Sequence, residues 1–298
     1  MTENSLRLFL YGQSIIRKSQ IPSIMQICRK FRLICVLLFT GVLGPLFSYA
    51  QELDRAPVLI ESSPVALLPF NSPQGLQRLM NASAKADFAE LANQFEAQSN
   101  RAFCGPTTAA IILNAIYGRV GPLPRDRSRI QPDDLKNLPP GFDLTVPRFT
   151  QETVIQQGKK TRAQVLGEPI LINGTLVRDG GYQLRQFDEL LRAHQLKTTL
   201  IIVSEQMNLA AIREDFKKNL QTDGDYLVVN YQRQEIGQTG GAHISPVGAY
   251  DEASDSVLIL DVNPAAHGWI WVPFPQLVKA MNTFDKIENR GYVLIEKN

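Results

Sequence analysis

Five short strand-like runs follow one another in the last quarter of the chain, and they constrain its fold more than any other feature. They are DYLVVNY, HISPVGAY, SVLILDV, WIWVPF and GYVLIEK, all within residues 225–297. Their β-branched and aromatic residues favour strands, and the short connections between most of them favour antiparallel pairing. Helical patterns dominate residues 73–118 and 181–222. We therefore predict an α+β fold in which a helical N-terminal half packs on an antiparallel sheet, with a cleft between the two.

The first 50 residues predict export. Lys30 and Arg32 precede the apolar stretch LICVLLFTGVLGPLF, and the small-x-small sequence Ser48-Tyr49-Ala50 follows it. This order is typical of a secretory signal peptide, so we predict cleavage after Ala50 and a periplasmic or otherwise exported protein, with Met25 as an alternative start. An uncleaved membrane anchor stays open, because the apolar stretch is near the shortest length that spans a bilayer.

The charge of the remaining chain argues against nucleic acid as a partner. Residues 1–50 hold six of the 31 Lys and Arg and one of the 29 Asp and Glu, which leaves a net charge of −3. No basic surplus is left to attract nucleic acid, and we expect membrane contact only through the signal segment. We divide the rest into a leader at 51–67 and one domain at 68–298, in which residues 119–150 form a long surface excursion.

Cys104 is the only cysteine outside the signal segment, since Cys28 and Cys35 lie within it. The exported chain can therefore form no internal disulfide, and the thiol is either a small buried hydrophobe or a reactive group. Gly105-Pro106 and the apolar run TTAAIILNAIYG follow it, so we expect Cys104 at the N-terminus of a largely buried helix. Unpaired N–H groups and the helix dipole at such a position favour the thiolate, which is the nucleophilic form.

The three histidines differ in their sequence surroundings. His194 ends an amphipathic helical pattern, which predicts a place on the surface or at a helix C-terminus, and His267 lies in a loop. His243 follows the flexible QTGGA and opens one strand, whereas Asp261 ends the next. Antiparallel pairing would bring both to one end of the sheet, where the carboxylate could fix the imidazole tautomer and leave the other nitrogen for the thiol. The alternative for Asp261 is a turn residue at the strand end.

Gln98 lies six residues before Cys104. Its side-chain amide could join the backbone N–H of Cys104 as an oxyanion hole for a tetrahedral intermediate, or it could be an exposed loop glutamine. The chain order Gln98, Cys104, His243, Asp261 is that of papain-like cysteine enzymes. The four residues together therefore indicate nucleophilic catalysis by a thiol.

The chain resembles the phytochelatin synthases, in particular their short bacterial forms. The resemblance covers most of residues 68–295, and its most specific part is NYQRQEIGQTGGAHISPVGAYD at 230–251. The other matching segments are LPFNSPQGLQRLM, FEAQSNRAFCG, FTQE, GYQLRQFDELL, LILDVNP and RGYVLI. The chain departs from the family pattern in the Pro-Thr-Thr that follows its Cys-Gly pair, where small residues are usual. The resemblance implies a papain-like cysteine proteinase fold.

The same resemblance implies a glutathione γ-glutamylcysteinyltransferase. The thiol would attack the Cys–Gly peptide bond of glutathione, release glycine and form a γ-glutamylcysteinyl thioester. Water would then give γ-glutamylcysteine, and a second glutathione would give a phytochelatin. The implied catalytic residues are Cys104 as nucleophile, His243 as base and acid, Asp261 as orienting carboxylate and Gln98 as oxyanion-hole amide. The implied substrate contacts are Asn230, Arg290, Asp285 and Gly241.

We expect hydrolysis to be faster than transpeptidation, because the cysteine-rich C-terminal region of long family members is absent and water needs no second binding site. With its one thiol assigned to catalysis, the protein is expected to bind no metal or other cofactor, and Cd or Zn would enter as metal–glutathione thiolate complexes in metal detoxification. Two other functions stay open: a papain-like cysteine peptidase acting on other exported peptides, and an inactive protein that binds glutathione or metal–thiol complexes. A homodimer also stays open.

Overall fold

The computed structural model describes residues 66–118, 120 and 122–296. The predicted signal peptide and almost all of the predicted leader lie outside these residues. Within them, seven strands form one antiparallel sheet. The order across the sheet is β1 (Leu68–Pro69), β8 (Ile270–Pro273), β7 (Ser256–Ile259), β6 (Ala242–Asp251), β5 (Tyr226–Gln232), β9 (Gly291–Glu296) and β4 (Lys197–Ile202). The prediction of an α+β chain with an antiparallel sheet is confirmed.

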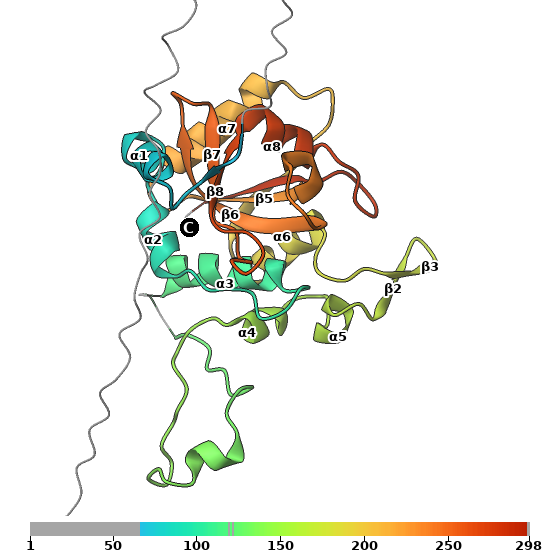
Figure 1. Cartoon of the computed structure of the whole chain (residues 1–298). Coiled ribbons are helices and arrows are strands. Elements are labelled where there is room, and N and C mark those ends of the chain that lie inside the picture. The colour runs from blue at the N-terminus through green and yellow to red at the C-terminus, as the bar shows by residue number, and fades with distance from the viewer. Residues whose placement is uncertain (1–65, 119, 121, 297–298) are drawn as a thin grey trace, which may run out of the picture. The chain divides into compact units, whose positions relative to one another are not determined.

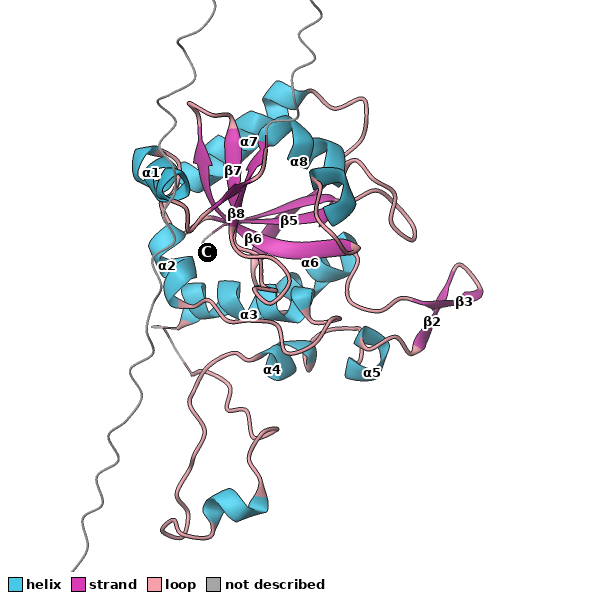
Figure 2. Cartoon of the chain, in the orientation of Figure 1, coloured by secondary structure: helices cyan, strands magenta, loops and turns pink. Residues whose placement is uncertain are grey.

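Helices cover both faces of this sheet (Figure 1, Figure 2). On one face lie α3 (Cys104–Tyr117) and α6 (Leu184–Ala193), and on the other lie α7 (Leu209–Gln221) and α8 (Phe274–Met281). The shorter helices are α1 (Pro73–Asn81), α2 (Phe88–Asn93), α4 (Gln151–Ile155), α5 (Arg162–Val165) and the 3₁₀ helices η1 (Pro132–Leu135) and η2 (Arg233–Ile236). In the part of the chain that the structure describes, no helix is both long enough and apolar enough to cross a membrane.

The two faces of the sheet carry two separate hydrophobic cores, and β5 contributes to both. Its Val228 packs with α3 and α6, whereas Leu227 and Val229 on either side of it pack with α7 and α8. This alternation is the period of two that a strand requires when both of its faces are covered. Both faces of the sheet are therefore covered by helices, and polar residues at the ends of its strands are the candidates for a functional site.

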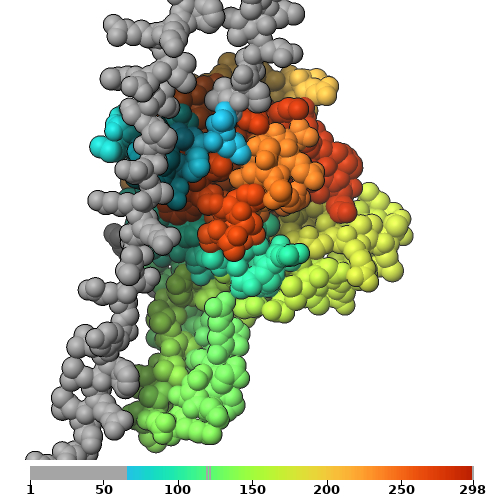
Figure 3. Space-filling view, in the orientation of Figure 1, coloured from blue at the N-terminus to red at the C-terminus, as the bar shows by residue number. Residues whose placement is uncertain are grey.

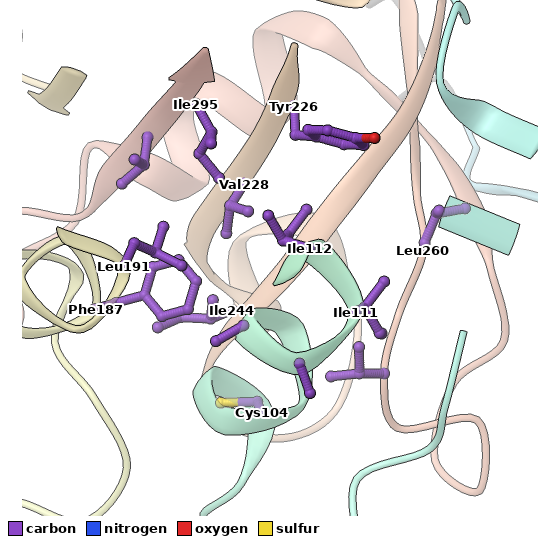
Figure 4. Packing of buried hydrophobic residues seen from close by; sticks show 14 of the residues in the cluster. Cys104, Ile111, Ile112, Phe187, Leu191, Tyr226, Val228, Ile244, Leu260 and Ile295 are labelled. Atoms are coloured by element: carbon purple, nitrogen blue, oxygen red, sulfur yellow. The ribbon is translucent and has the colours of Figure 1, made fainter. Parts of the chain in front are cut away.

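α3 is apolar on nearly all sides and lies in the interior of the first core. Ile111, Ile112 and Leu113 are fully buried, and each such side chain contributes about 2 kcal/mol by leaving water. Thr108 ties the helix to β6, because its hydroxyl donates to the Ile244 carbonyl at 3.2 Å. Figure 4 shows Cys104 in the first turn of α3, in the same hydrophobic cluster as Ile111 and Ile112. The start of α3 is therefore fixed against the sheet.

Three elements differ from the sequence prediction. Residues 197–202 lie in a region predicted to be mainly helical, but they form edge strand β4 because they pair with β9 along their whole length. Helix α8 interrupts the series of strands, and β2 (Pro169–Ile172) and β3 (Thr175–Arg178) form an unexpected two-stranded hairpin. The predicted surface excursion is present: residues 122–150 are mostly loop and protrude from the body as the green segment in Figure 3.

Candidate active site

Cys104 is the first residue of α3, and 9% of its surface is exposed. No side chain caps this helix end, so its N–H groups stay directed toward the thiol region. Burial raises the pKa of the thiol, but a hydrogen bond with His243, the His243 charge and the backbone N–H groups of Ile244 and Gly105 together bring the pKa below its usual value. The thiol is therefore set to ionise more readily than a free cysteine.

His243 lies near the start of β6 and is buried. Its Nε2 atom lies 3.0 Å from Oδ1 of Asp261, although the two groups lack the alignment of a hydrogen bond. Burial lowers the pKa of His243, but contacts with Asp261 and Cys104 outweigh this effect and raise the pKa above its usual value. Burial raises the pKa of Asp261, but His243 and a neighbouring arginine bring it down to about 2. A charged carboxylate therefore faces an imidazole that favours its protonated form.

Strand pairing explains why His243 and Asp261 meet. β6 and β7 are antiparallel neighbours joined by a tight turn, in which Asp255 adopts a positive φ of 43°. The chain leaves β7 beside the residues where β6 begins, since the Leu260 N–H donates to the Pro246 carbonyl at 2.9 Å. The sequence predicted this meeting from the order of two strands alone, and the structure brings the two side chains together.

Arg233 is a charged neighbour of Asp261 that the sequence analysis missed. Its guanidinium lies 2.5 Å (Nη1 to Oδ2) and 2.9 Å (Nη2 to Oδ1) from the carboxylate, and both side chains are buried. Next to them, burial and the Asp261 charge raise the pKa of Tyr231 well above its usual value, so this phenol stays neutral. The signal that could have revealed Arg233 is a cation directly after an apolar strand and ten residues before His243.

Gln98 is tied to the chain that follows Asp261, because its N–H donates to the Val262 carbonyl at 2.8 Å. Its side-chain Nε2 donates to the Asn100 carbonyl at 2.7 Å, so one of its two amide hydrogens is occupied. Gln151 of α4 holds the backbone on both sides, donating to the Ala97 carbonyl at 2.9 Å and accepting from the Ser99 N–H at 2.8 Å. The structure therefore places the Gln98 backbone beside the residue that follows Asp261, and one hydrogen of its side-chain amide has no partner among the described residues.

A second buried ion pair lies next to the segment that packs against the start of α3. Lys160 and Asp179 lie 3.1 Å apart, and the Lys160 ammonium also donates to the Gly181 carbonyl at 2.7 Å. These bonds fix the segment that carries Tyr182, whose ring packs on Gly105 so closely that a Cβ atom at Gly105 would lie 3.0 Å from it. A larger residue after Cys104 would press on the Tyr182 ring, so glycine suits this packing. The sequence analysis did not detect the ion pair.

The predicted substrate contacts lie at the same end of the sheet. Asn230 is fully buried in β5 opposite Ile244, and neither its Nδ2 nor its Oδ1 has a hydrogen-bond partner among the described residues. Arg290 and Asp285 form a 3.3 Å ion pair, and the Nε atom of Arg290 also lacks a partner there. Burial and the nearby Asp179 raise the pKa of Asp285, while Arg290 opposes the change. Gly241 is exposed and accepts a 3.3 Å hydrogen bond from the Arg233 N–H.

The other two histidines lie apart from these residues. His194 follows α6 as its C-cap, but the prediction of a surface position is wrong: it is buried, and its Nε2 lies 2.9 Å from the Val154 carbonyl. Burial lowers the pKa of His194, so the ring favours its neutral form. His267 is in a loop as predicted, with its Nε2 2.9 Å from the Thr239 carbonyl. Among residues 66–118, 120 and 122–296, no cluster of three or more His, Cys, Asp or Glu could hold a metal ion.

Comparison with known proteins gives one family and several relatives. The family model described as phytochelatin synthase matches residues 61–131 and 145–292, which is more than half of the chain. Glutathione gamma-glutamylcysteinyltransferase 3 of Lotus japonicus is 26% identical over 242 residues, covering 79% of this chain and 43% of that protein. The glutathione gamma-glutamylcysteinyltransferase of Schizosaccharomyces pombe is 25% identical over 238 residues, covering 78% and 50%. Glutathione gamma-glutamylcysteinyltransferase 2 of Arabidopsis thaliana is 27% identical over 235 residues, covering 76% of this chain and 44% of that protein. The chain thus spans about half the length of these relatives.

Proposed function

Because the chain belongs to the phytochelatin synthase family, we propose that it cleaves the Cys–Gly peptide bond of glutathione through a thioester on Cys104. The observation that carries this proposal is the buried pair of His243 and Asp261, 3.0 Å apart, beside Cys104 at the start of α3, whose pKa His243 lowers. All three residues lie within the matched parts of the chain. The names of the relatives supply the substrate class, since each describes transfer of a γ-glutamylcysteinyl group from glutathione.

The first half of the proposed reaction forms the thioester. The Cys104 thiolate attacks the cysteinyl carbonyl, and the oxyanion that develops accepts hydrogen bonds from the N–H groups at the start of α3 and from the free amide hydrogen of Gln98. Imidazolium His243 then donates its proton to the leaving glycine nitrogen, the C–N bond breaks, and the thioester remains. Asp261 keeps the imidazole oriented and stabilises its positive charge.

The second half of the reaction resolves the thioester. Neutral His243 removes a proton from water or from the α-amino group of a second glutathione, which attacks the thioester carbonyl. The C–S bond then breaks and Cys104 leaves as thiolate. We propose that water is the faster acceptor, because a second glutathione must first be bound and ordered. γ-Glutamylcysteine is then the main product and phytochelatin the minor one.

The γ-glutamyl end of glutathione carries an ammonium and a carboxylate, and the Asp285–Arg290 pair offers one partner of each opposite charge. Arg290 can bind the carboxylate in a planar fork, which lysine would reproduce poorly. Asn230 offers a donor and an acceptor that no described residue uses, and these suit a peptide group of the substrate. The exposed Gly241 leaves room beside them for the substrate chain.

Several finer features belong to the same proposal. A nucleophile at the start of a buried helix, facing a His and Asp pair on an antiparallel sheet, supports a papain-like fold. Cd or Zn would act as a complex with the thiolates of glutathione rather than as a resident cofactor. The enzyme would be exported by its N-terminal segment, which the sequence predicts.

The test is to incubate the full chain with millimolar glutathione, with and without Cd, and to measure glycine, γ-glutamylcysteine and phytochelatin by mass spectrometry. We expect glycine release, and more γ-glutamylcysteine than two-repeat phytochelatin at every time point without metal. Dominance of the longer peptide from the earliest points would contradict the preference for water. Cleavage of unrelated peptides with no glycine release from glutathione would indicate a peptidase instead, and binding of glutathione without turnover would indicate a binding protein.

A further inference from the structure

Arg233 is the side chain that holds Asp261 most closely. Both terminal nitrogens of its guanidinium contact the carboxylate, at 2.5 Å and 2.9 Å, and Nη1 also donates to the Gln238 side chain at 2.8 Å. Only 5% of the Arg233 side chain and none of the Asp261 side chain is exposed. A planar fork in this position fixes the rotation of the carboxylate as well as its place. Each terminal nitrogen of Arg233 therefore has a partner inside the protein.

The loop between η2 and β6 encloses this guanidinium. The Arg233 N–H donates to the Gly241 carbonyl at 3.3 Å, and the Gln238 N–H donates to the Arg233 carbonyl at 3.0 Å. Gly240 adopts a φ of 107°, which other residues rarely tolerate, and a Cβ atom there would lie 3.2 Å from Cδ of Arg233. The loop then runs into β6 and His243 within three residues. The loop between η2 and β6 therefore determines the positions of both the Arg233 guanidinium and His243.

The charges in this region come from several elements. The ion pair consists of Arg233 from η2 and Asp261 after β7. The titratable groups that act on it are Cys104 from α3, Tyr231 from β5 and His243 from β6. The phenol is neutral and arginine keeps its charge at every accessible pH. The Arg233 cation therefore balances the Asp261 anion, and the thiolate and imidazolium balance each other.

We propose that Arg233 is a positioning residue of the thiol site: it aims the Asp261 carboxylate at His243 and cancels its charge. The consequence for turnover rests on the function proposed above, but the consequence for the thiol does not. Without the Arg233 cation, the Cys104 thiolate loses a stabilising charge and the imidazolium faces an uncompensated carboxylate, so both pKa values rise. Without the Asp261 charge, the buried guanidinium acts alone and both pKa values fall.

The test is the pH dependence of alkylation of Cys104 by iodoacetamide in the full chain, measured on the Cys104 peptide by mass spectrometry so that Cys28 and Cys35 do not contribute. Relative to the wild type, we expect the midpoint to rise by about one pH unit in Arg233→Met and to fall by about one pH unit in Asp261→Asn. The double variant should return to within about a third of a unit of the wild type, because the buried charge is balanced again.

The matched control is Arg213→Met. Arg213 of α7 also forms a two-point ion pair, with Asp255 at 2.9 Å and 2.8 Å, but this pair joins α7 to the turn between β6 and β7. The midpoint of Cys104 alkylation in Arg213→Met should equal that of the wild type. An unchanged midpoint in Arg233→Met, or shifts of equal sign in the two single variants, would overturn the charge-balancing role.

Arg233→Lys separates charge from geometry and also serves if Arg233→Met does not fold. Lysine keeps the positive charge but not the fork. We expect its alkylation midpoint to stay near that of the wild type, while kcat for glycine release falls roughly tenfold and KM changes less than about twofold. A wild-type kcat in this variant would overturn the positioning role. If even the wild type releases no glycine from glutathione, the proposed function fails, but the alkylation midpoints still decide the role of Arg233.

Discussion

The ion pair of Lys160 with Asp179 and that of Arg233 with Asp261 are both buried, but the protein satisfies the first far more completely than the second. The Lys160 ammonium donates to two carbonyls and two side chains, and Asp179 also accepts from Gln183 and Gln186. Beside Arg233, the contacts of Asp261 Oδ2 with Arg233 and of His243 Nε2 with Asp261 lack hydrogen-bond alignment, and both polar side-chain atoms of Asn230 have no partner among the described residues.

This difference distinguishes a region that stabilises the fold, around Lys160 and Asp179, from a region suited to proton transfer, around Arg233 and Asp261. A saturated buried network has one arrangement and resists change, which suits the segment that packs behind Gly105. A network with spare donors and acceptors can exchange protons and contact a substrate, and it retains these groups although an unpaired buried polar atom is destabilising. Substitutions in the two regions should therefore affect different quantities.

The largest expected effect is in the region with spare polar groups. Cys104→Ser should lower kcat for glycine release by roughly 10³-fold or more, because a hydroxyl at this position ionises far less readily than the thiol. The free energy of unfolding should change by less than about 1 kcal/mol, since the two side chains have similar volume. Glycine release and urea unfolding of the same preparation check both values. A serine variant with more than a tenth of the activity would remove Cys104 from the reaction.

The next effect is in the saturated region and concerns stability. Lys160→Met should lower the free energy of unfolding by about 3 kcal/mol, because it leaves Asp179 charged and buried without its cation. The double variant Lys160→Met with Asp179→Asn should recover most of this loss. Urea unfolding measures it, and the kcat of the folded fraction should stay within about threefold of the wild type. A large loss of kcat without loss of stability would show that Lys160 acts in the chemistry.

Gln98→Ala should lower kcat by roughly 10²-fold with little change in KM, because the oxyanion exists only in the transition state and the intermediate. The matched control is Gln77→Ala on the exposed side of α1, which should leave kcat and stability within error of the wild type. Steady-state kinetics of glycine release measure the effect. Equal kcat values for the two alanine variants would assign Gln98 to loop structure alone.

The lowered pKa of Cys104 predicts a pH effect. A lower pKa means that the thiolate persists at more acidic pH, so at pH 6 iodoacetamide should label Cys104 at least about tenfold faster than glutathione, whose free thiol has a pKa of about 8.5. Labelling of the Cys104 peptide over time measures the rate. A rate equal to that of glutathione at pH 6 would show that His243 and the start of α3 do not activate the thiol.

The smallest expected effect tests the spare groups directly. Asn230→Leu should leave the free energy of unfolding unchanged or raise it by up to about 1 kcal/mol, because it removes a buried amide whose two polar atoms have no described partner. KM for glutathione should rise by roughly tenfold if those atoms bind the substrate. Urea unfolding and steady-state kinetics check the two changes. A loss of stability of 2 kcal/mol or more would place Asn230 in the supporting framework instead.

The sequence predicts the parts of the site that depend on local order along the chain. Cys104 is recognised from the helix that it begins, and His243 and Asp261 are placed together because one antiparallel strand begins where its neighbour ends. The sequence does not predict the ion pairs, because their formation depends on how the loops fold. Lys160 meets Asp179 only after the intervening hairpin has formed, and Arg233 meets Asp261 only when the Gly240 loop turns back.

Two errors in the fold have the same origin. His194 lies at a helix C-terminus, one of the two places that its pattern predicts, but the alternative of a surface position is wrong because the Val154 carbonyl of α4 contacts the ring in the interior. Residues 197–202 become a strand because β9, almost a hundred positions later in the chain, offers them an edge. Local propensity carries no information on such partners.

The place of β9 in the sheet has a consequence for the synthesis of the protein. β9 is the last strand in chain order among the described residues, yet it lies between β5 and β4 in the sheet. Until a ribosome has released residues 291–296, both neighbours keep an open edge, and loop closure over this sequence separation is slow. The nascent chain therefore cannot complete the sheet before β9 emerges, and chaperone binding should be strong up to this point and fall afterwards.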